Sequence, residues 1–291
     1  MVLWISTPYF LTISNLLNVA QQTSINAIIA VGMSFVIITA GIDLSVGSLV
    51  AFSGVVLAYS LHGGTPLPLA IVLGLAVGLL CGLVNGLLIT LGSLPPFIST
   101  LGMMSVARGG ALLFTQGRPI SGFSRSFRFL ATGEILHVPT PVVIMGVVYL
   151  LAHFLLSRTK LGRYTYAIGG NEQAAILSGV NVKFHKTLVY GLCGMLSGLA
   201  AIILTARLNS AQPIAGIMYE LDAIAAAVIG GTSLMGGEGT IFGTLIGAFI
   251  MGVLRNGLNL LDVSSFIQQI VIGAVIIVAV LIDMKLKKQH T

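Results

Sequence analysis

Long apolar stretches follow one another along the chain with only short polar turns between them. A helix needs roughly 17 to 25 predominantly apolar residues to cross the hydrocarbon core of a bilayer. The pattern therefore predicts about nine full transmembrane helices, over residues 23–41, 45–62, 67–91, 96–115, 140–157, 187–206, 219–235, 239–261 and 264–283.

The beginning of the chain differs from these spans. The segment 1–11 is apolar but provides only about 16 Å of helix against a hydrocarbon core of about 30 Å, and it lacks the basic region of a signal peptide. We expect it to be a shortened first helix or an interfacial segment, and we expect residues 15–22 to lie at the membrane interface. The predicted fold class is an all-α polytopic membrane protein.

Composition supports this class. Of the 291 residues, 56% are hydrophobic and 8% are charged, whereas soluble domains carry about 25% charged residues. The net charge of +6 is then a signal of orientation in the membrane, and no nucleic-acid-binding module is present, so membrane lipid and not nucleic acid is the expected surrounding. Cys81 and Cys193 lie within apolar spans and give no redox information.

One polar interval between spans, 158–186, carries a dense positive charge. It contains five basic residues against one acid, Glu172, and the positive-inside rule places it in the cytoplasm. The basic tail at Lys285, Lys287 and Lys288 places the C-terminus on the same side. Counting spans back from the tail also puts the interval inside. The charge of the interval and the span count therefore agree.

The same interval contains a short predicted helix. Asn171 is a suitable N-cap, and Ala174, Ala175, Leu177 and Val180 follow at roughly helical spacing. One interpretation is a knob that inserts into a cytoplasmic partner, and the other is a helix that lies on the membrane surface. The residues assigned to such a coupling element are Gly169, Gly170, Asn171, Glu172, Ala175 and Leu177.

The interval 116–139 breaks the charge rule. By the same count it lies outside, although it carries Arg118, Arg125 and Arg128. Either the count is wrong at this point, or these arginines face something anionic. The two candidates are an acidic surface of a partner and lipid headgroups.

An internal repeat relates the two halves of the chain. Similar landmarks occur in the same order in both halves, namely Gly63-Gly64-Thr65, Asn85-Gly86 and Phe97-Ile98 in the first and Gly230-Gly231-Thr232, Asn256-Gly257 and Phe266-Ile267 in the second. The predicted spans run in opposite directions, which indicates an inverted repeat of the kind found in transport folds. The alternative is chance similarity between glycine-rich helices. We predict one permease-like domain with inverted halves over about 12–157 and 187–283, joined by the interval 158–186.

Glycine also recurs at helical spacing within single spans. Ladders of this kind allow helices to approach closely. They occur at Gly74, Gly78, Gly82 and Gly86, at Gly191, Gly194 and Gly198, and at Gly243 and Gly247.

Four polar residues at predicted helix starts are candidates for a pathway or gate. Asp43 and Ser45 occupy the short break after the span 23–41, and Glu220 and Asp222 begin the span 219–235. Capping of the following helix is one explanation. Exposure to a central path is the other, because ionisable residues inside membranes are commonly functional.

Neither catalysis nor metal binding is predicted. No histidine stands near the acids, and the five histidines are scattered without metal-ligand spacing. No lysine follows a glycine, so the phosphate-binding loop of an ATPase is missing. The chain is therefore not expected to hydrolyse ATP, which leaves an externally powered subunit, an ion-coupled carrier or a passive channel.

Motifs over nearly the whole chain resemble the permease subunits of bacterial ATP-binding-cassette (ABC) importers for monosaccharides. They are Gly41-Ile-Asp-Leu-Ser-Val-Gly-Ser48, Leu161-Gly-Arg-Tyr-Thr-Tyr-Ala-Ile-Gly-Gly-Asn-Glu172, Ser210-Ala-Gln-Pro213 and Tyr219-Glu-Leu-Asp-Ala-Ile-Ala-Ala-Ala-Val-Ile-Gly-Gly-Thr-Ser233. The resemblance favours ribose, although xylose, galactose and autoinducer permeases are similar over the same stretches.

The resemblance implies a non-enzymatic pore subunit in the bacterial inner membrane. Its implied partners are a second copy of the chain, a periplasmic sugar-binding protein and a cytoplasmic ABC ATPase that binds ATP and Mg²⁺, so that this chain binds no cofactor itself. It also implies that residues 169–180 touch the ATPase. The alternative function is an ion-coupled secondary carrier for a small polar solute.

Overall fold

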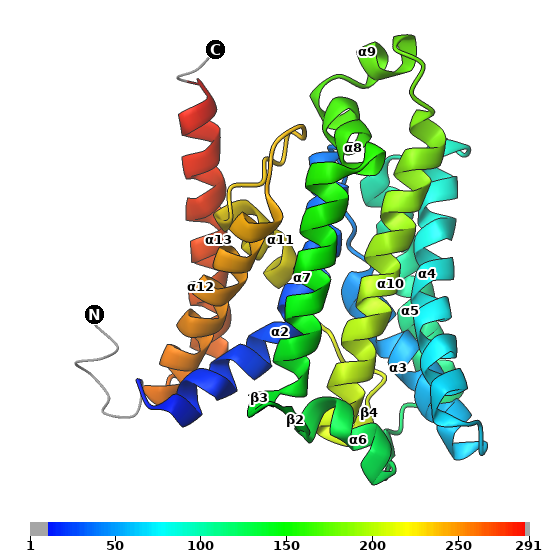
Figure 1. Cartoon of the computed structure of the whole chain (residues 1–291), viewed down its shortest axis with the longest axis vertical. Coiled ribbons are helices and arrows are strands. Elements are labelled where there is room, and N and C mark those ends of the chain that lie inside the picture. The colour runs from blue at the N-terminus through cyan, green and yellow to red at the C-terminus, as the bar shows by residue number, and fades with distance from the viewer. Residues whose placement is uncertain (1–10, 289–291) are drawn as a thin grey trace.

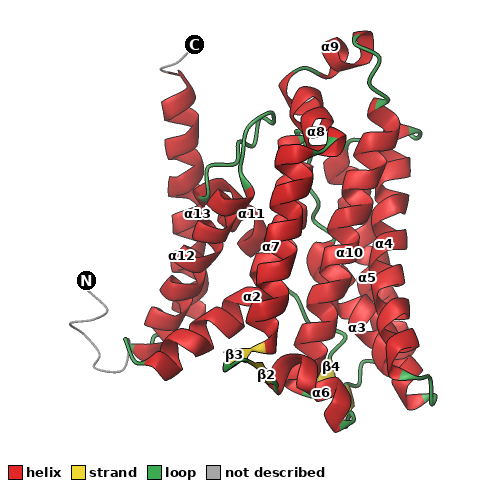
Figure 2. Cartoon of the chain, in the orientation of Figure 1, coloured by secondary structure: helices red, strands yellow, loops and turns green. Residues whose placement is uncertain are grey.

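The computed structural model describes residues 11–288 and is almost entirely helical (Figures 1 and 2). The helices are α2 (Ile13–Ile38), α3 (Val46–His62), α4 (Leu67–Thr90), α5 (Pro96–Thr115), α6 (Arg125–Thr132), α7 (Thr140–Arg158), α8 (Lys160–Gly170), α9 (Glu172–Leu177), α10 (Val182–Leu208), α11 (Tyr219–Ile229), α12 (Ile241–Leu260) and α13 (Ser265–Lys288). Four two-residue strands form two antiparallel pairs, β1 (Ile120–Ser121) with β4 (Ser210–Ala211) and β2 (Glu134–Ile135) with β3 (Val138–Pro139).

Six of the described helices are long and apolar enough to cross a membrane, namely α2, α4, α5, α7, α10 and α12. The helices α3 and α13 contribute shorter apolar stretches, Val46–His62 and Ser265–Leu281. The chain is thus an all-α, multi-span membrane protein, as predicted.

The predicted full span over 219–235 is wrong. Helix α11 has 11 residues, about 16 Å of helix, which cannot cross a hydrocarbon core of about 30 Å. The helix ends at Gly230, and Gly231 takes a positive φ of 86° that starts a glycine-rich loop over 230–240. No charged residue occurs between Ile229 and Glu238, so the pattern did not mark the end of the helix.

The N-terminal prediction also needs correction. Helix α2 begins at Ile13 and continues without a break to Ile38, so residues 15–22 belong to the same helix as the predicted span over 23–41. The Thr12 hydroxyl caps it by accepting a hydrogen bond from the Asn15 N–H at 3.3 Å. The shortened first helix predicted over 1–11 lies, apart from Leu11, outside the described residues.

The short elements gather at two opposite ends of the helix bundle (Figure 1). Helices α8 and α9 lie at one end, toward which α13 also runs, and we call it the α9 end. Helix α6 and the strands lie at the other, the α6 end. The interval 158–186 and the interval 116–139 are therefore on opposite sides, as the count of spans predicted.

Helices α2 and α10 form the centre of the bundle, and glycines allow α4 to pack directly on α10. A side chain at Gly78 would collide with the Gly194 carbonyl, and one at Gly82 with the Tyr190 carbonyl. The two glycine ladders expected from the sequence therefore face each other. Close backbone approach, rather than interlocking large side chains, holds this pair of helices together.

We expect Gly78→Ala to destabilise the protein, because the new methyl group overlaps backbone that has no free space to move. The cost should be about 1–3 kcal/mol, as for other overpacked interiors. Thermal unfolding of purified protein in detergent measures it. The matched control is Gly102→Ala in α5, where nothing lies within 4 Å of the added methyl. An equal loss in both variants would contradict direct α4–α10 packing.

Candidate functional site

The break between α2 and α3 is organised by Asp43, which is fully buried. Its Oδ1 accepts hydrogen bonds from the Ser45 N–H at 2.9 Å and the Ser45 hydroxyl at 2.6 Å. The Asn85 amide donates to Ser45 Oγ at 3.0 Å, and Ser99 Oγ donates to Asn85 Oδ1 at 3.4 Å. A buried polar chain thus ties this break to α4 and α5.

A second break, over 209–218, leads into α11. Its carbonyls at Pro213 and Ala215 accept hydrogen bonds from Arg108 Nη1 of α5, at 2.8 and 2.7 Å. This single guanidinium satisfies backbone groups that have left a helix within the bundle. Sequence reasoning did not identify Arg108.

The two breaks meet at a pair of glycines. A side chain at Gly47, in the first turn of α3, would collide with the Gly216 carbonyl, and one at Gly216 would collide with the Gly47 carbonyl. The half-buried Glu220 places its carboxylate beside Gly47 as well. The structure therefore brings the α3 and α11 starts together.

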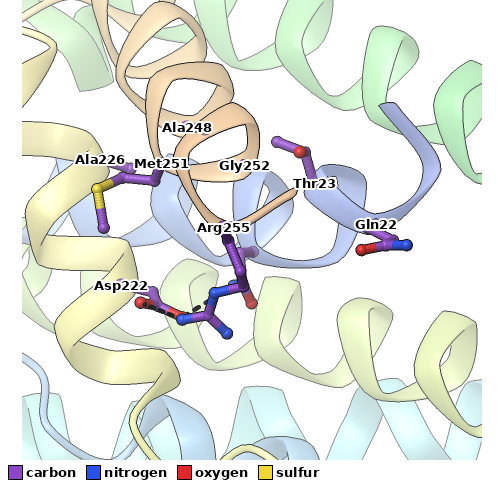
Figure 3. Close-up of a pocket in the computed structure, with 9 residues that line it drawn as sticks. Gln22, Thr23, Asp222, Ala226, Ala248, Met251, Gly252 and Arg255 are labelled. Atoms are coloured by element: carbon purple, nitrogen blue, oxygen red, sulfur yellow. Dashed lines mark hydrogen bonds and ion pairs between the residues drawn. The ribbon is translucent and has the colours of Figure 1, made fainter. Parts of the chain in front are cut away.

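Asp222 belongs to a different cluster, between α2, α11 and α12 (Figure 3). Both of its carboxylate oxygens accept from Arg255 Nη2, at 3.0 and 2.9 Å, and Oδ2 also accepts from Asn26 Nδ2 at 3.1 Å. A cavity of about 40 Å³ lies beside this cluster. Thr23 Oγ1 and Asn26 Oδ1 line or adjoin it without a hydrogen-bond partner among the described residues.

At the α9 end, the predicted cap is confirmed. Asn171 Oδ1 accepts from the Ala174 N–H at 2.9 Å and starts the short helix α9. Ala175 is buried against Ile168 and Val182, whereas Leu177 is 88% exposed. Glu172 and the Lys186 ammonium form an ion pair at 2.6 Å.

Helix α8 is joined to the loop over 230–240. The Gly237 N–H donates to the Ile38 carbonyl at 2.9 Å, and Gly169 packs so closely on both groups that no side chain fits. The Tyr166 hydroxyl donates to the Gly239 carbonyl at 2.6 Å. Burial raises the pKa of Tyr166 above its usual value, so the hydroxyl keeps the proton it donates. The 230–240 loop of this junction directly follows α11 in the chain.

At the α6 end, Arg118, Arg125 and Arg128 are all exposed. Helix α6 is anchored by the fully buried Phe127 and capped by Ser124. The pairing of β1 with β4 links this region to the segment before α11. Phe123 N–H adds a hydrogen bond to Asn209 Oδ1 at 2.9 Å.

The structure gives the candidate acids partners that sequence reasoning missed. Arg108, Arg255 and Asn26 contribute the main polar contacts of the second break and of Asp222. The available signal was a single arginine within an otherwise apolar span, at 96–115 and again at 239–261. Such residues face a protein interior or a polar cavity rather than lipid.

Together these features define a multi-span membrane protein with broken helices and buried charge, the architecture of transport proteins. Residues 15–280 match the family described as "Branched-chain amino acid transport system / permease component", and the chain belongs to this family. No solved structure matches the chain with significance.

Curated relatives are similar over almost the full chain. The ribose import permease protein RbsC of Escherichia coli (strain K12) is 54% identical over 283 residues, which cover 96% of this chain and 88% of the relative. RbsC of Bacillus subtilis (strain 168) is 52% identical over 283 residues, covering 97% and 88%. The D-allose transport system permease protein AlsC of E. coli is 42% identical over 285 residues, covering 98% and 87%.

We expect Arg108→Gln to lower stability, because the shorter neutral side chain leaves the Pro213 and Ala215 carbonyls without their donor. Hydrogen bonds to charged groups contribute about 1.5–3 kcal/mol each, so the thermal midpoint should fall by several degrees. Arg118→Gln, at an exposed position, is the matched control. A thermal midpoint unchanged in both variants would show that the second break does not need Arg108.

Proposed function

We propose that this chain is the membrane-spanning permease subunit of an ABC importer for ribose, which a periplasmic binding protein delivers. The observation that carries the proposal is the 54% identity to a ribose import permease over 96% of the chain. In this function the chain forms the path and catalyses no reaction. ATP and Mg²⁺ bind to the partner ATPase.

The helix directions support inverted halves. The Ile38 carbonyl at the end of α2 contacts Gly169 of α8 at the α9 end. The end of α10 leads into Asn209, which accepts a hydrogen bond from Phe123, next to α6. These two central helices therefore run in opposite directions (Figure 1). Each is followed by a break and then by a shorter helix, α3 or α11, as inverted repeats require.

We place the α9 end in the cytoplasm, where Arg158, Lys160 and Arg163 satisfy the positive-inside rule. The exposed Leu177 on the capped helix α9 then faces the ATPase. A movement of α9 reaches α11 through the junction that Gly169 and Tyr166 form with the 230–240 loop. A second copy of the chain completes the pore.

The proposal is tested by uptake into proteoliposomes. We expect import of ribose only when the ATPase, ATP and the sugar-loaded binding protein are all present. The rival function, an ion-coupled carrier, predicts uptake by the chain alone that follows an ion gradient. Uptake without ATPase and binding protein would contradict our proposal.

We expect Leu177→Asp to reduce co-purification of the ATPase at least tenfold while membrane levels stay the same, because Leu177 makes few contacts within the chain. Leu136→Asp is the matched control, since Leu136 is 90% exposed at the opposite end. Glu172→Lys is a less direct test, because it replaces the ion pair between Glu172 and Lys186 by two lysines that repel each other. Equal ATPase recovery in Leu177→Asp and the control would refute docking at α9.

We expect external salt to weaken uptake driven by the binding protein, because exposed charges are screened beyond about 8 Å at physiological ionic strength. Replacing Arg118, Arg125 and Arg128 by glutamine should flatten that salt dependence and leave ATPase docking unchanged. Retained salt dependence in the triple variant would assign these arginines to lipid headgroups instead.

The side of this surface has a direct check. Ser126 is exposed on α6 and, unlike Ser124, does not cap the helix. In a chain with Cys81 and Cys193 replaced, Ser126→Cys should react with a membrane-impermeant thiol reagent from the periplasmic side. Reaction only from the cytoplasmic side would reverse the proposed orientation.

A further inference from the structure

A groove of about 360 Å³ lies along α11 and α13, next to the Asp222–Arg255 pair. Its polar lining consists of Asp222, Arg255, Ser265, Gln268 and Gln269, and apolar side chains such as Ile217 and Ile272 complete it. Ligand pockets typically have volumes of about 300–1,000 Å³ and combine apolar walls with a few polar groups. The groove therefore has room for one small polar molecule.

The ion pair keeps hydrogen-bonding capacity for a ligand. Arginine carries five N–H donors, and the hydrogen bonds of Arg255 with the described residues use only Nη2, so the Nε and Nη1 donors are available within residues 11–288. The side chain of Arg255 is 39% exposed, whereas that of Asp222 is nearly buried. A fixed carboxylate thus orients a guanidinium whose free edge can donate to neutral oxygen atoms.

Gln269 adds an exposed amide across the groove, with one carbonyl acceptor and two donors. The amide of Gln268 is already used, because its Nε2 donates to Asn259 Oδ1 and to the Val263 carbonyl, both at 2.8 Å. The groove thus offers donors from α12 and both donors and acceptors from α13.

Behind the ion pair, the 40 Å³ cavity holds unused polar atoms. Thr23 is 4% exposed, and its hydroxyl lines the cavity without a partner (Figure 3). Asn26 Oδ1 is also unpartnered, although Asn26 Nδ2 holds Asp222. Buried polar groups normally have partners, so unsatisfied atoms in a cavity indicate a bound hydroxyl or water.

The groove lies near the α6 end. Arg255 is five residues from the end of α12, about 8 Å along the helix, and the neighbouring Asn256 pairs with Asn15 near the start of α2. In the proposed orientation this half of the protein receives sugar from the binding protein. Asp222 also stands in the first turn of α11, the helix joined to the α9 end.

We propose that the Asp222–Arg255 pair and Gln269 bind the hydroxyl groups of a monosaccharide in this groove. The proposal rests on the proposed function and extends it, because it places a sugar-recognition step within the permease itself. The free Arg255 donors bond sugar oxygens, and the Gln269 carbonyl accepts from a sugar hydroxyl. Water linked to Thr23 and Asn26 holds the carboxylate in position from behind.

The test uses the complete complex in nanodiscs, with Cys81 and Cys193 replaced and with Ser265→Cys as the reporter, because Ser265 is exposed in the groove and is not one of the proposed sugar contacts. We expect millimolar ribose to slow labelling by a small thiol reagent at least threefold. The same concentration of tetrahydropyran, a neutral ring ether without hydroxyl groups, should have no effect. Adding Arg255→Gln should remove the protection by ribose.

A purely structural ion pair is distinguished by exchanging the charges. In a chain with native Ser265, Asp222→Arg with Arg255→Asp should restore the thermal midpoint lost in Arg255→Gln. It should not restore the KM for ribose-dependent uptake, which we expect to rise at least tenfold in both variants. Full recovery of the KM in the exchanged variant would overturn the binding role.

Failure of this site and failure of the proposed function give different results. Absence of ribose protection in a complex whose native-Ser265 counterpart imports ribose would refute the site alone. Ribose protection in a complex that imports no ribose would support the site and refute the importer. Absence of both would refute both.

Discussion

Backbone groups that leave a helix inside a membrane need partners within the protein, because lipid offers none. Within residues 11–288, the chain leaves helical structure between packed helices at 39–45 and at 209–218. In the first break, the Asp43 carboxylate accepts hydrogen bonds from the N–H and the hydroxyl of Ser45. In the second break, the Arg108 guanidinium donates to the carbonyls of Pro213 and Ala215. These hydrogen bonds allow α3 and α11 to begin within the bundle, where Gly47 and Gly216 bring them into contact.

The short helix α11 is held from both ends of the molecule. The segment before it pairs with β1, next to the exposed arginines of the α6 end. The loop after it bonds to α2 and α8 through Gly237 and Gly239. The surfaces proposed to meet the binding protein and the ATPase therefore converge on one helix of 11 residues. Since Asp222 lies on that helix, a movement of α8 reaches the proposed sugar groove through few intermediate contacts.

The sequence was sufficient to predict the all-α class, the cap at Asn171 and the opposite placement of the intervals 116–139 and 158–186. Apolar periodicity could not reveal that α11 ends at Ile229, because no charged residue occurs between Ile229 and Glu238 to mark the end. Nor could it pair Asp222 with Arg255, 33 residues away, or with Asn26, 196 residues away. Such contacts depend on three-dimensional packing, although a lone arginine within an apolar span indicates that some partner exists.

Distances between spin labels in the complex test most directly whether α8 and the 230–240 loop move as one unit. Exposed positions for the labels are Ala167 on α8, Met235 in the loop and Leu91 at the end of α4. On addition of ATP, we expect the distance between 167 and 235 to stay constant while the distance between 167 and 91 changes. A change between 167 and 235 with a constant distance between 167 and 91 would contradict transmission from α8 to α11.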